Sequence, residues 1–222
     1  MIYAEARKSV CDTAIRMWKA GLVVGSAGNV SVRAPSDETH FVITPSSIAY
    51  DQLTPEQIVV VDEEGDLLEL DDEEFGRAPS FETPVHLAVY AARPDVNAVV
   101  HTHSKWASAC AVARAPIPPV IDEMVVYLGG GVEVADYASS GSDELAAFVV
   151  EALDARSAVL LCAHGVLTTG MNLTKAFKNA ELVEHVAQVV TIARQIRGGP
   201  LPALPEEVLE AERSMYEIVK KM

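Results

Sequence analysis

Two histidines one residue apart are the first feature of the sequence that could carry chemistry. His101 and His103 stand in NAVVHTHSKWA, where they follow an apolar run that ends in Val99 and Val100. Side chains alternate along a strand with a period of two, so both imidazoles would project from one face and could share a cation. Imidazole is the commonest metal ligand in proteins. The alternative is that one histidine caps the following helix and the other packs in the core, and the pair alone does not decide.

A third histidine, His164, ends another apolar run, VLLCAHGVL, and precedes a glycine that would let the backbone turn sharply. Alone, a histidine in that setting is more often a packed core residue or a turn donor. Together with His101 and His103 it gives the three imidazoles of a catalytic zinc site, which keeps one position open for water or substrate. Such a site can polarise a carbonyl and stabilise an enolate as a Lewis acid.

A carboxylate upstream of the histidines is the candidate proton-transfer group. Glu82, in APSFETPVH, stands at the expected start of the helix that precedes the histidine strand. An acid there can simply compensate the helix dipole, which is worth about 0.3–1 kcal/mol. The other interpretation is that the turn from helix to strand returns Glu82 beside the strand end that bears His101. We expect His86 to pack in the helix or at a subunit contact, while His40 and His185 carry no spacing signal.

Helices and strands alternate along the chain and must position these residues. Apolar spacing and capping residues predict helices over 3–20, 104–115, 142–155, 173–197 and 206–221, and one that begins near 80–84 and ends at about 92. Short strands are expected within 21–47, a hairpin over 58–70 with Glu64-Gly65 as its turn, and a buried strand before His103. Two more strands are expected in 157–170, interrupted by His164-Gly165. Residues 71–80 read as an acidic surface loop and 116–119 as an irregular crossing. One mixed α/β domain over 1–222 is the prediction.

Composition and charge narrow the class of protein. The formal net charge of −15 argues against nucleic acid or an anionic membrane as the main partner, because both favour basic patches. No apolar run approaches the roughly 18 residues that span a bilayer. Three scattered cysteines and the absence of a signal peptide at the N-terminus predict a cytoplasmic protein.

The Gly-rich loop of residues 25–31, GSAGNVS, matches neither the P-loop nor the dinucleotide-binding pattern. Small residues with available N–H groups can still cradle a phosphate without a lysine. Thr44, Ser46, Ser47 and Ser80 offer further hydroxyls. A flexible turn without a ligand is the other interpretation, and it stays open on these residues alone.

Taken together, GNVS (28–31), TPSS (44–47), PSFE (79–82), the segment 86–104 and HGVL (164–167) resemble the class II aldolase/adducin superfamily over nearly the whole chain. The resemblance implies a three-layer α/β/α fold around a mainly antiparallel sheet, assembled as a homotetramer with sites between subunits. It also implies one Zn²⁺ per subunit, or another divalent metal, held by His101, His103 and His164. Glu82 matches the family's glutamate, a metal ligand at rest and the proton-transfer group during turnover.

Within the superfamily the resemblance is to aldolases that cleave small ketose phosphates, such as L-fuculose 1-phosphate, reversibly into dihydroxyacetone phosphate and an aldehyde. A glutamate at position 82 favours this activity, since the pentulose-phosphate epimerase has an aspartate there. HTHSKWA and ETP resemble that epimerase, which stays an alternative with other sugar-phosphate lyases, ahead of a non-catalytic adducin-like interaction domain. The residues that match the aldolase phosphate loops are Gly28, Asn29, Thr44, Ser46, Ser47 and Ser80.

Several positions depart from the aldolase pattern. Ser47 stands where the phosphate loop usually has glycine, and Phe81 stands where a second serine is common. Glu123 occupies the place of a tyrosine on the aldehyde side of the site; it is predicted as a proton donor, with Tyr127 as a substitute. Tyr216 is the tyrosine expected to close the site from the C-terminal tail.

Overall fold

The computed structural model describes residues 2–68 and 78–222, and a seven-stranded sheet runs through their centre. The strand order is β3-β2-β1-β4-β7-β6-β5. Neighbouring strands are antiparallel except β5 and β6, which are parallel. The mainly antiparallel sheet that the resemblance implied is therefore confirmed. The strands are β1 (Asn29–Arg33), β2 (Phe41–Ile43), β3 (Val59–Val61), β4 (Ala98–Thr102), β5 (Glu133–Ala135), β6 (Ala158–Leu161) and β7 (Gly165–Gly170).

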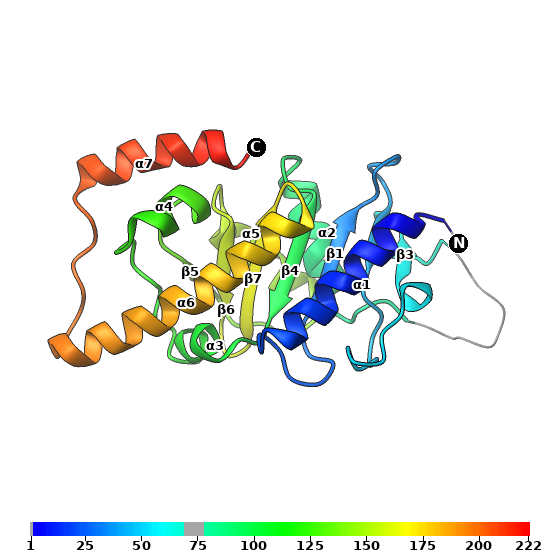
Figure 1. The fold of residues 1–222 in the computed structure, drawn as a ribbon, viewed down its shortest axis with the longest axis horizontal. Helices are drawn as coiled ribbons and strands as arrows, with labels where there is room; N and C mark the ends of the chain where they lie inside the picture. The colour runs from blue at the N-terminus through cyan, green and yellow to red at the C-terminus, as the bar shows by residue number, and fades with distance from the viewer. Residues whose placement is uncertain (1, 69–77) are drawn as a thin grey trace.

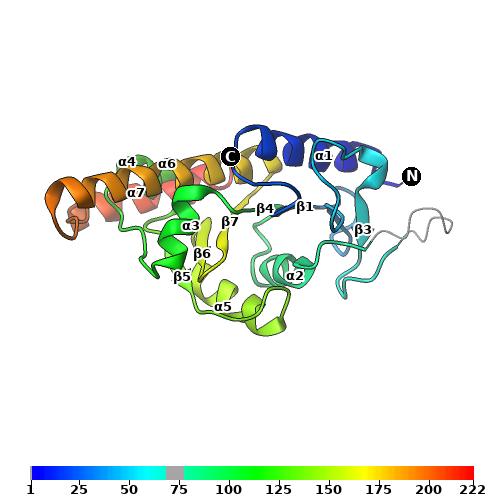
Figure 2. The same cartoon turned by 90° about the horizontal axis from the view of Figure 1, so that it is seen from below.

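Helices cover both faces of the sheet, which gives the three layers expected. α1 and α6 lie over one face and α2 and α5 over the other (Figures 1 and 2). Alternate residues of β4 divide between these layers: Val100 packs in the cluster with α1 and α6, and Val99 in the cluster with α2 and α5. A third cluster joins α3, α4 and α7 to α6. The helices are α1 (Ala4–Lys19), α2 (Thr83–Ala92), α3 (Lys105–Val112), α4 (Asp122–Leu128), α5 (Asp143–Leu153), α6 (Leu173–Arg197) and α7 (Glu206–Val219), with a 3₁₀ turn at Pro55–Gln57.

Local capping residues start the helices close to where the sequence predicts them. Pro84 stands in the first turn of α2, where its missing N–H costs nothing. The side chain of Ser142 accepts from the Leu145 N–H at the start of α5, and that of Asn172 accepts from the Lys175 N–H at the start of α6. These caps set the direction in which each helix leaves the sheet.

Among the α-helices and strands, α4 and β5 were not predicted. Both are flanked by prolines or glycines, so the local pattern is weak, and burial of Met124, Val125 and Leu128 in the third cluster is what stabilises α4. The predicted hairpin is present up to the pairing of Val61 with Leu67 after the turn at Gly65. Its last two residues and most of the predicted acidic loop fall within 69–77, outside the described residues. Among the described residues, no helix is long and apolar enough to cross a membrane.

Candidate metal centre

The ends of two central strands bring the three histidines together. β4 and β7 are antiparallel, and Thr102 pairs with Val166, so the end of β4 lies beside the start of β7. His101 is in the last part of β4 and His103 follows it, while His164 lies in the turn that enters β7. The strand register therefore turns two histidine positions more than 60 residues apart into one cluster.

The four predicted ligands converge in the structure. One ligand atom from each of Glu82, His101, His103 and His164 lies within 4.8 Å of every other. His101 Nε2 is 3.0 Å from His103 Nε2 and 3.1 Å from Glu82 Oε2, and Glu82 Oε1 is 3.4 Å from His164 Nε2. Three imidazoles and a carboxylate that face one point are a donor set that suits a divalent transition metal, zinc in particular.

Hydrogen bonds to His101 and Glu82 orient these two ligands for metal binding. His101 Nδ1 donates to the Val166 carbonyl at 3.0 Å, which leaves the Nε2 lone pair for a cation. Asn29 Nδ2 donates to Glu82 Oε2 and Ser140 Oγ to Glu82 Oε1, both at 2.8 Å. Each carboxylate oxygen thus has one neutral donor and one imidazole neighbour. The residues present fit a bound metal.

Charge and burial set the protonation of the cluster. Burial would raise the pKa of Glu82, but His101, His164 and the Asn29 amide favour the ionised carboxylate and hold its pKa well below the usual range. Burial, reinforced by His101, lowers the pKa of His103 to about 4 and also lowers that of His164. Since only neutral imidazole binds a metal, these ligands are ready to bind at neutral pH.

Gly165 is essential for a different reason from the one the sequence suggested. The left-handed residue of the turn is Ala163, with φ 56°, and Gly165 is already in strand β7. A Cβ added at Gly165 would overlap the Thr102 carbonyl oxygen and lie 3.0 Å from the His103 ring. The glycine therefore permits the close approach of the two strands that carry the histidines.

Gly28, just before β1, permits a similarly close approach of the chain to β4 on its other side. It has φ 75°, and a Cβ there would come within 2.5 Å of the His101 carbonyl oxygen. The next residue, Asn29, pairs directly with His101 across β1 and β4. Two of the predicted substrate residues therefore lie against the metal cluster.

The pairing of the segment at Pro45 with the segment at Pro79 brings the other predicted substrate residues to the same edge of the sheet. These residues are Thr44, Ser46, Ser47 and Ser80. Pro45 pairs with Pro79, the Ser46 N–H donates to Ala78 and the Ser80 N–H donates to the Thr44 carbonyl. Ser80 Oγ accepts from the Glu82 N–H at 3.3 Å, which links this loop pair to the cluster. Phe81, whose side chain is exposed, stands between them.

Ser47, at the position where the resemblance leads us to expect a glycine, adopts a backbone conformation that favours glycine. Its φ is 63°, in the left-handed region that costs a non-glycine residue roughly 1–3 kcal/mol when the surroundings impose it. We expect Ser47→Gly to leave stability unchanged or raise it by up to about 1 kcal/mol, because relief of strain offsets the larger chain entropy of glycine. Ser46→Gly, at a residue whose Oγ donates to Pro79 and whose φ is not positive, should destabilise. Urea unfolding checks both, and a clear loss of stability in Ser47→Gly would contradict this account.

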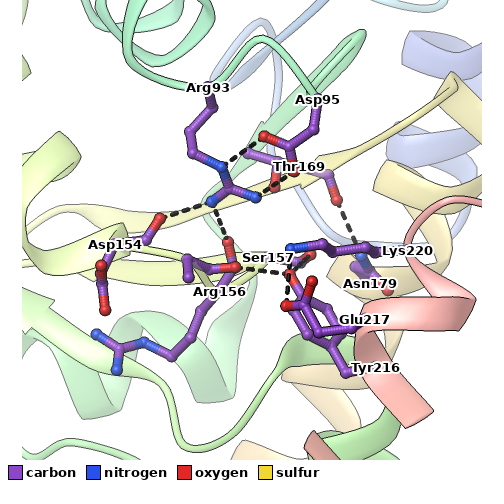
Figure 3. A network of polar contacts seen from close by, with 11 residues as sticks. Arg93, Asp95, Asp154, Arg156, Ser157, Thr169, Asn179, Tyr216, Glu217 and Lys220 are labelled. Atoms are coloured by element: carbon purple, nitrogen blue, oxygen red, sulfur yellow. Dashed lines mark hydrogen bonds and ion pairs between the residues drawn. The ribbon is translucent and has the colours of Figure 1, made fainter. Parts of the chain in front are cut away.

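Glu123 and Tyr216 lie away from the cluster within one chain. Glu123 is exposed in the first turn of α4, one helical turn before the exposed Tyr127. Tyr216 is buried, its hydroxyl donates to the Ala155 carbonyl at 2.9 Å and it lies 2.8 Å from Ser157 Oγ (Figure 3). Ser157 precedes β6 whereas His164 follows it, so the two sites are at opposite ends of that strand.

Two residues that support the cluster were missed by the sequence analysis. Ser140 lies in a loop of small residues where nothing in the pattern indicates contact with Glu82. Glu184, on α6, accepts from the N–H groups of Trp106 and Ala107 at 2.9–3.0 Å and so caps α3, directly after the histidine pair. Neither contact has a spacing signal, because both join residues more than 50 positions apart.

Comparisons with known proteins agree with this geometry. The family of class II aldolase and adducin N-terminal domains matches residues 8–191. The L-fuculose phosphate aldolase of Shigella flexneri is 37% identical over 200 residues, 90% of this chain and 88% of the relative. The 5-deoxy-D-ribulose 1-phosphate aldolase of Bacillus thuringiensis is 31% identical over 98% of each chain. A solved structure of an L-fuculose 1-phosphate aldolase has a TM-score of 0.89 at 32% identity, over 98% of each chain. The chain belongs to the class II aldolase and adducin family.

Proposed function

We propose that this chain is a zinc-dependent aldolase that reversibly cleaves a small ketose phosphate into dihydroxyacetone phosphate and an aldehyde. The observation that carries the proposal is the convergence of Glu82 with His101, His103 and His164 beside hydroxyl-bearing loops. L-Fuculose 1-phosphate is the first candidate substrate, and 5-deoxy-D-ribulose 1-phosphate is the second because its aldolase is similar over 98% of this chain.

The three imidazoles and Glu82 would hold the metal, and zinc suits this donor set best. When bound, it would act as a Lewis acid on the substrate carbonyl. The lowered pKa values of His103 and His164 and the donation from His101 Nδ1 to Val166 prepare the ligands for it.

Glu82 is assigned the proton transfer. In cleavage, the hydroxyl on C4 of the ketose phosphate loses its proton, the bond between C3 and C4 breaks, and C4 becomes the carbonyl carbon of the aldehyde while the electron pair stays on C3. Glu82 then delivers a proton taken from solvent to C3, which gives dihydroxyacetone phosphate, and in synthesis it removes that proton again and returns it to solvent. The hydrogen bonds from Asn29 and Ser140 orient both of its carboxylate oxygens.

The phosphate of the substrate is assigned to the paired loops. Backbone N–H groups near Gly28 and Ser47 and the hydroxyls of Ser46 and Ser80 lie at the edge where the loops meet. Phe81 can offer only its backbone N–H in place of a serine hydroxyl. The side chain of Asn29 is already engaged with Glu82, so its contribution to phosphate would come from the backbone.

A second group must accept the proton of the hydroxyl on the carbon that becomes the aldehyde. We assign this role to Glu123, with Tyr127 and Tyr216 as the other candidates. All three are on α4 or α7, away from the cluster of their own chain. A homotetramer with sites between subunits, as the resemblance implies, would bring these helices to a neighbouring metal centre. We also expect the protein in the cytoplasm, where the three buried cysteines would stay unpaired.

Release of dihydroxyacetone phosphate from L-fuculose 1-phosphate by the zinc-loaded protein tests the proposal. We expect release that a chelator abolishes and added zinc restores, with 5-deoxy-D-ribulose 1-phosphate as a parallel substrate. Chelator-insensitive release would contradict the metal mechanism. No release from either substrate, with epimerisation of L-ribulose 5-phosphate instead, would establish the epimerase alternative.

A further inference from the structure

A chain of hydrogen bonds leads from the core of the protein to the carboxylate of Glu82. Tyr90 OH is 2.8 Å from Ser31 Oγ, and Ser31 Oγ is 2.6 Å from His86 Nδ1. His86 Nε2 is 2.5 Å from Asn29 Oδ1, and Asn29 Nδ2 is 2.8 Å from Glu82 Oε2. All five side chains are buried, with His86 only 1% exposed. His86, which the sequence suggested packs in the helix or at a subunit contact, is therefore connected through Asn29 to the Glu82 carboxylate.

Which group donates and which accepts in each hydrogen bond of this chain follows from the Glu82 carboxylate at its end. The carboxylate of Glu82 can only accept, so the Asn29 amide must present Nδ2 to it and Oδ1 to His86. An amide oxygen also only accepts, so His86 Nε2 must carry a proton. In the neutral ring with its proton on Nε2, Nδ1 is the acceptor from Ser31 Oγ at 2.6 Å. Ser31 in turn accepts from Tyr90, so every donor in the chain points toward Glu82.

We infer that His86 is a positioning residue: its Nε2–H fixes the orientation of the Asn29 amide, which in turn holds the Glu82 carboxylate toward the three histidines. With the His86 donor removed, only the hydrogen bond to Glu82 Oε2 still orients the Asn29 amide, and a rotated amide would place its oxygen against the carboxylate. Ser140 holds only the other carboxylate oxygen. The consequence for turnover rests on the proposed function, whereas the consequence for metal binding does not.

Three variants separate positioning from packing. His86→Leu fills the space without hydrogen bonds, His86→Gln keeps a donor toward Asn29, and His185→Leu changes an exposed histidine on α6 as the control. We expect His86→Leu to weaken zinc binding by about 10- to 100-fold, the usual effect of losing a partner behind a metal ligand, and to lower kcat more than it raises KM. His86→Gln should recover most of both losses, and His185→Leu should match the parent protein.

Zinc affinity is measured by competition with a chromogenic chelator, without substrate, so the inference survives if the proposed substrates fail. Proton–nitrogen correlation spectra of the unmodified, zinc-loaded protein should show His86 as the neutral Nε2–H tautomer at pH 7, assigned by its loss in His86→Gln. A folded His86→Leu with the zinc affinity of the parent would overturn the inference. So would an Nδ1–H tautomer at His86, because Nε2 would then have no proton to donate to Asn29. That result decides the matter even if His86→Leu does not fold.

Discussion

Glu82→Gln is expected to lower kcat for aldol cleavage by about 10²- to 10⁴-fold while the protein still binds its metal. The amide has the shape of the carboxylate but cannot carry the proton between carbon and solvent. The three histidines, whose ring centroids are 4.7–4.8 Å apart, remain to hold the metal. Zinc affinity should nevertheless fall, because a charged ligand is lost and one end of the amide now presents N–H groups to Asn29 or Ser140.

Steady-state kinetics together with metal analysis measure this prediction. Glu181→Gln, a change of the same chemistry at an exposed position of α6, is the matched control and should behave as the parent protein. A Glu82→Gln protein that holds zinc and turns over at the parental rate would remove Glu82 from the mechanism. Loss of zinc and activity together would reduce Glu82 to a metal ligand.

Gly165→Ala is expected to lower the free energy of unfolding by about 1–3 kcal/mol or more and to weaken metal binding. The added methyl would overlap the Thr102 carbonyl oxygen, and it would also lie 3.0 Å from the His103 ring and 3.2 Å from the His101 ring. Backbone atoms in the centre of a sheet cannot yield as the end of a flexible side chain can. The overlap can be relieved only if β4 and β7 move apart at the ends that carry the metal ligands.

Gly199→Ala provides the matched control, because a Cβ there meets nothing within 4 Å. Urea unfolding and zinc competition on both variants give the two effects separately. Gly165→Ala with the stability and zinc affinity of the parent would show that the strands do not approach as closely as described here.

The metal cluster was predictable from sequence because its ligands lie at the ends of apolar runs. Such runs become central strands, and a His-x-His pair at a strand end must put both rings on one face. Glu82 was predictable because Pro84 marks the start of the helix behind it. The Ser47 substitution was also visible in the sequence, although its positive φ needed the structure.

The supporting residues were not predictable, because their roles depend on tertiary distance. Ser140 contacts Glu82 across 58 positions of sequence, Glu184 contacts Ala107 across 77, and His86 contacts Asn29 across 57. No local pattern encodes these contacts. α4 was missed for the same reason, since packing against α7 and α6 stabilises a helix only seven residues long. The place of Tyr216 at the far end of β6 likewise follows from how α7 docks.

Exchange of solvent deuterium into dihydroxyacetone phosphate tests the central claim most directly, because it needs neither the correct aldehyde nor cleavage. The zinc-loaded protein in D₂O should exchange one hydrogen at the hydroxymethyl carbon, and Glu82→Gln or removal of the metal should each abolish this exchange. That result would establish that the cluster binds the metal and that Glu82 moves the proton. Exchange at the parental rate in zinc-loaded Glu82→Gln, or exchange that survives complete removal of the metal, would contradict the account.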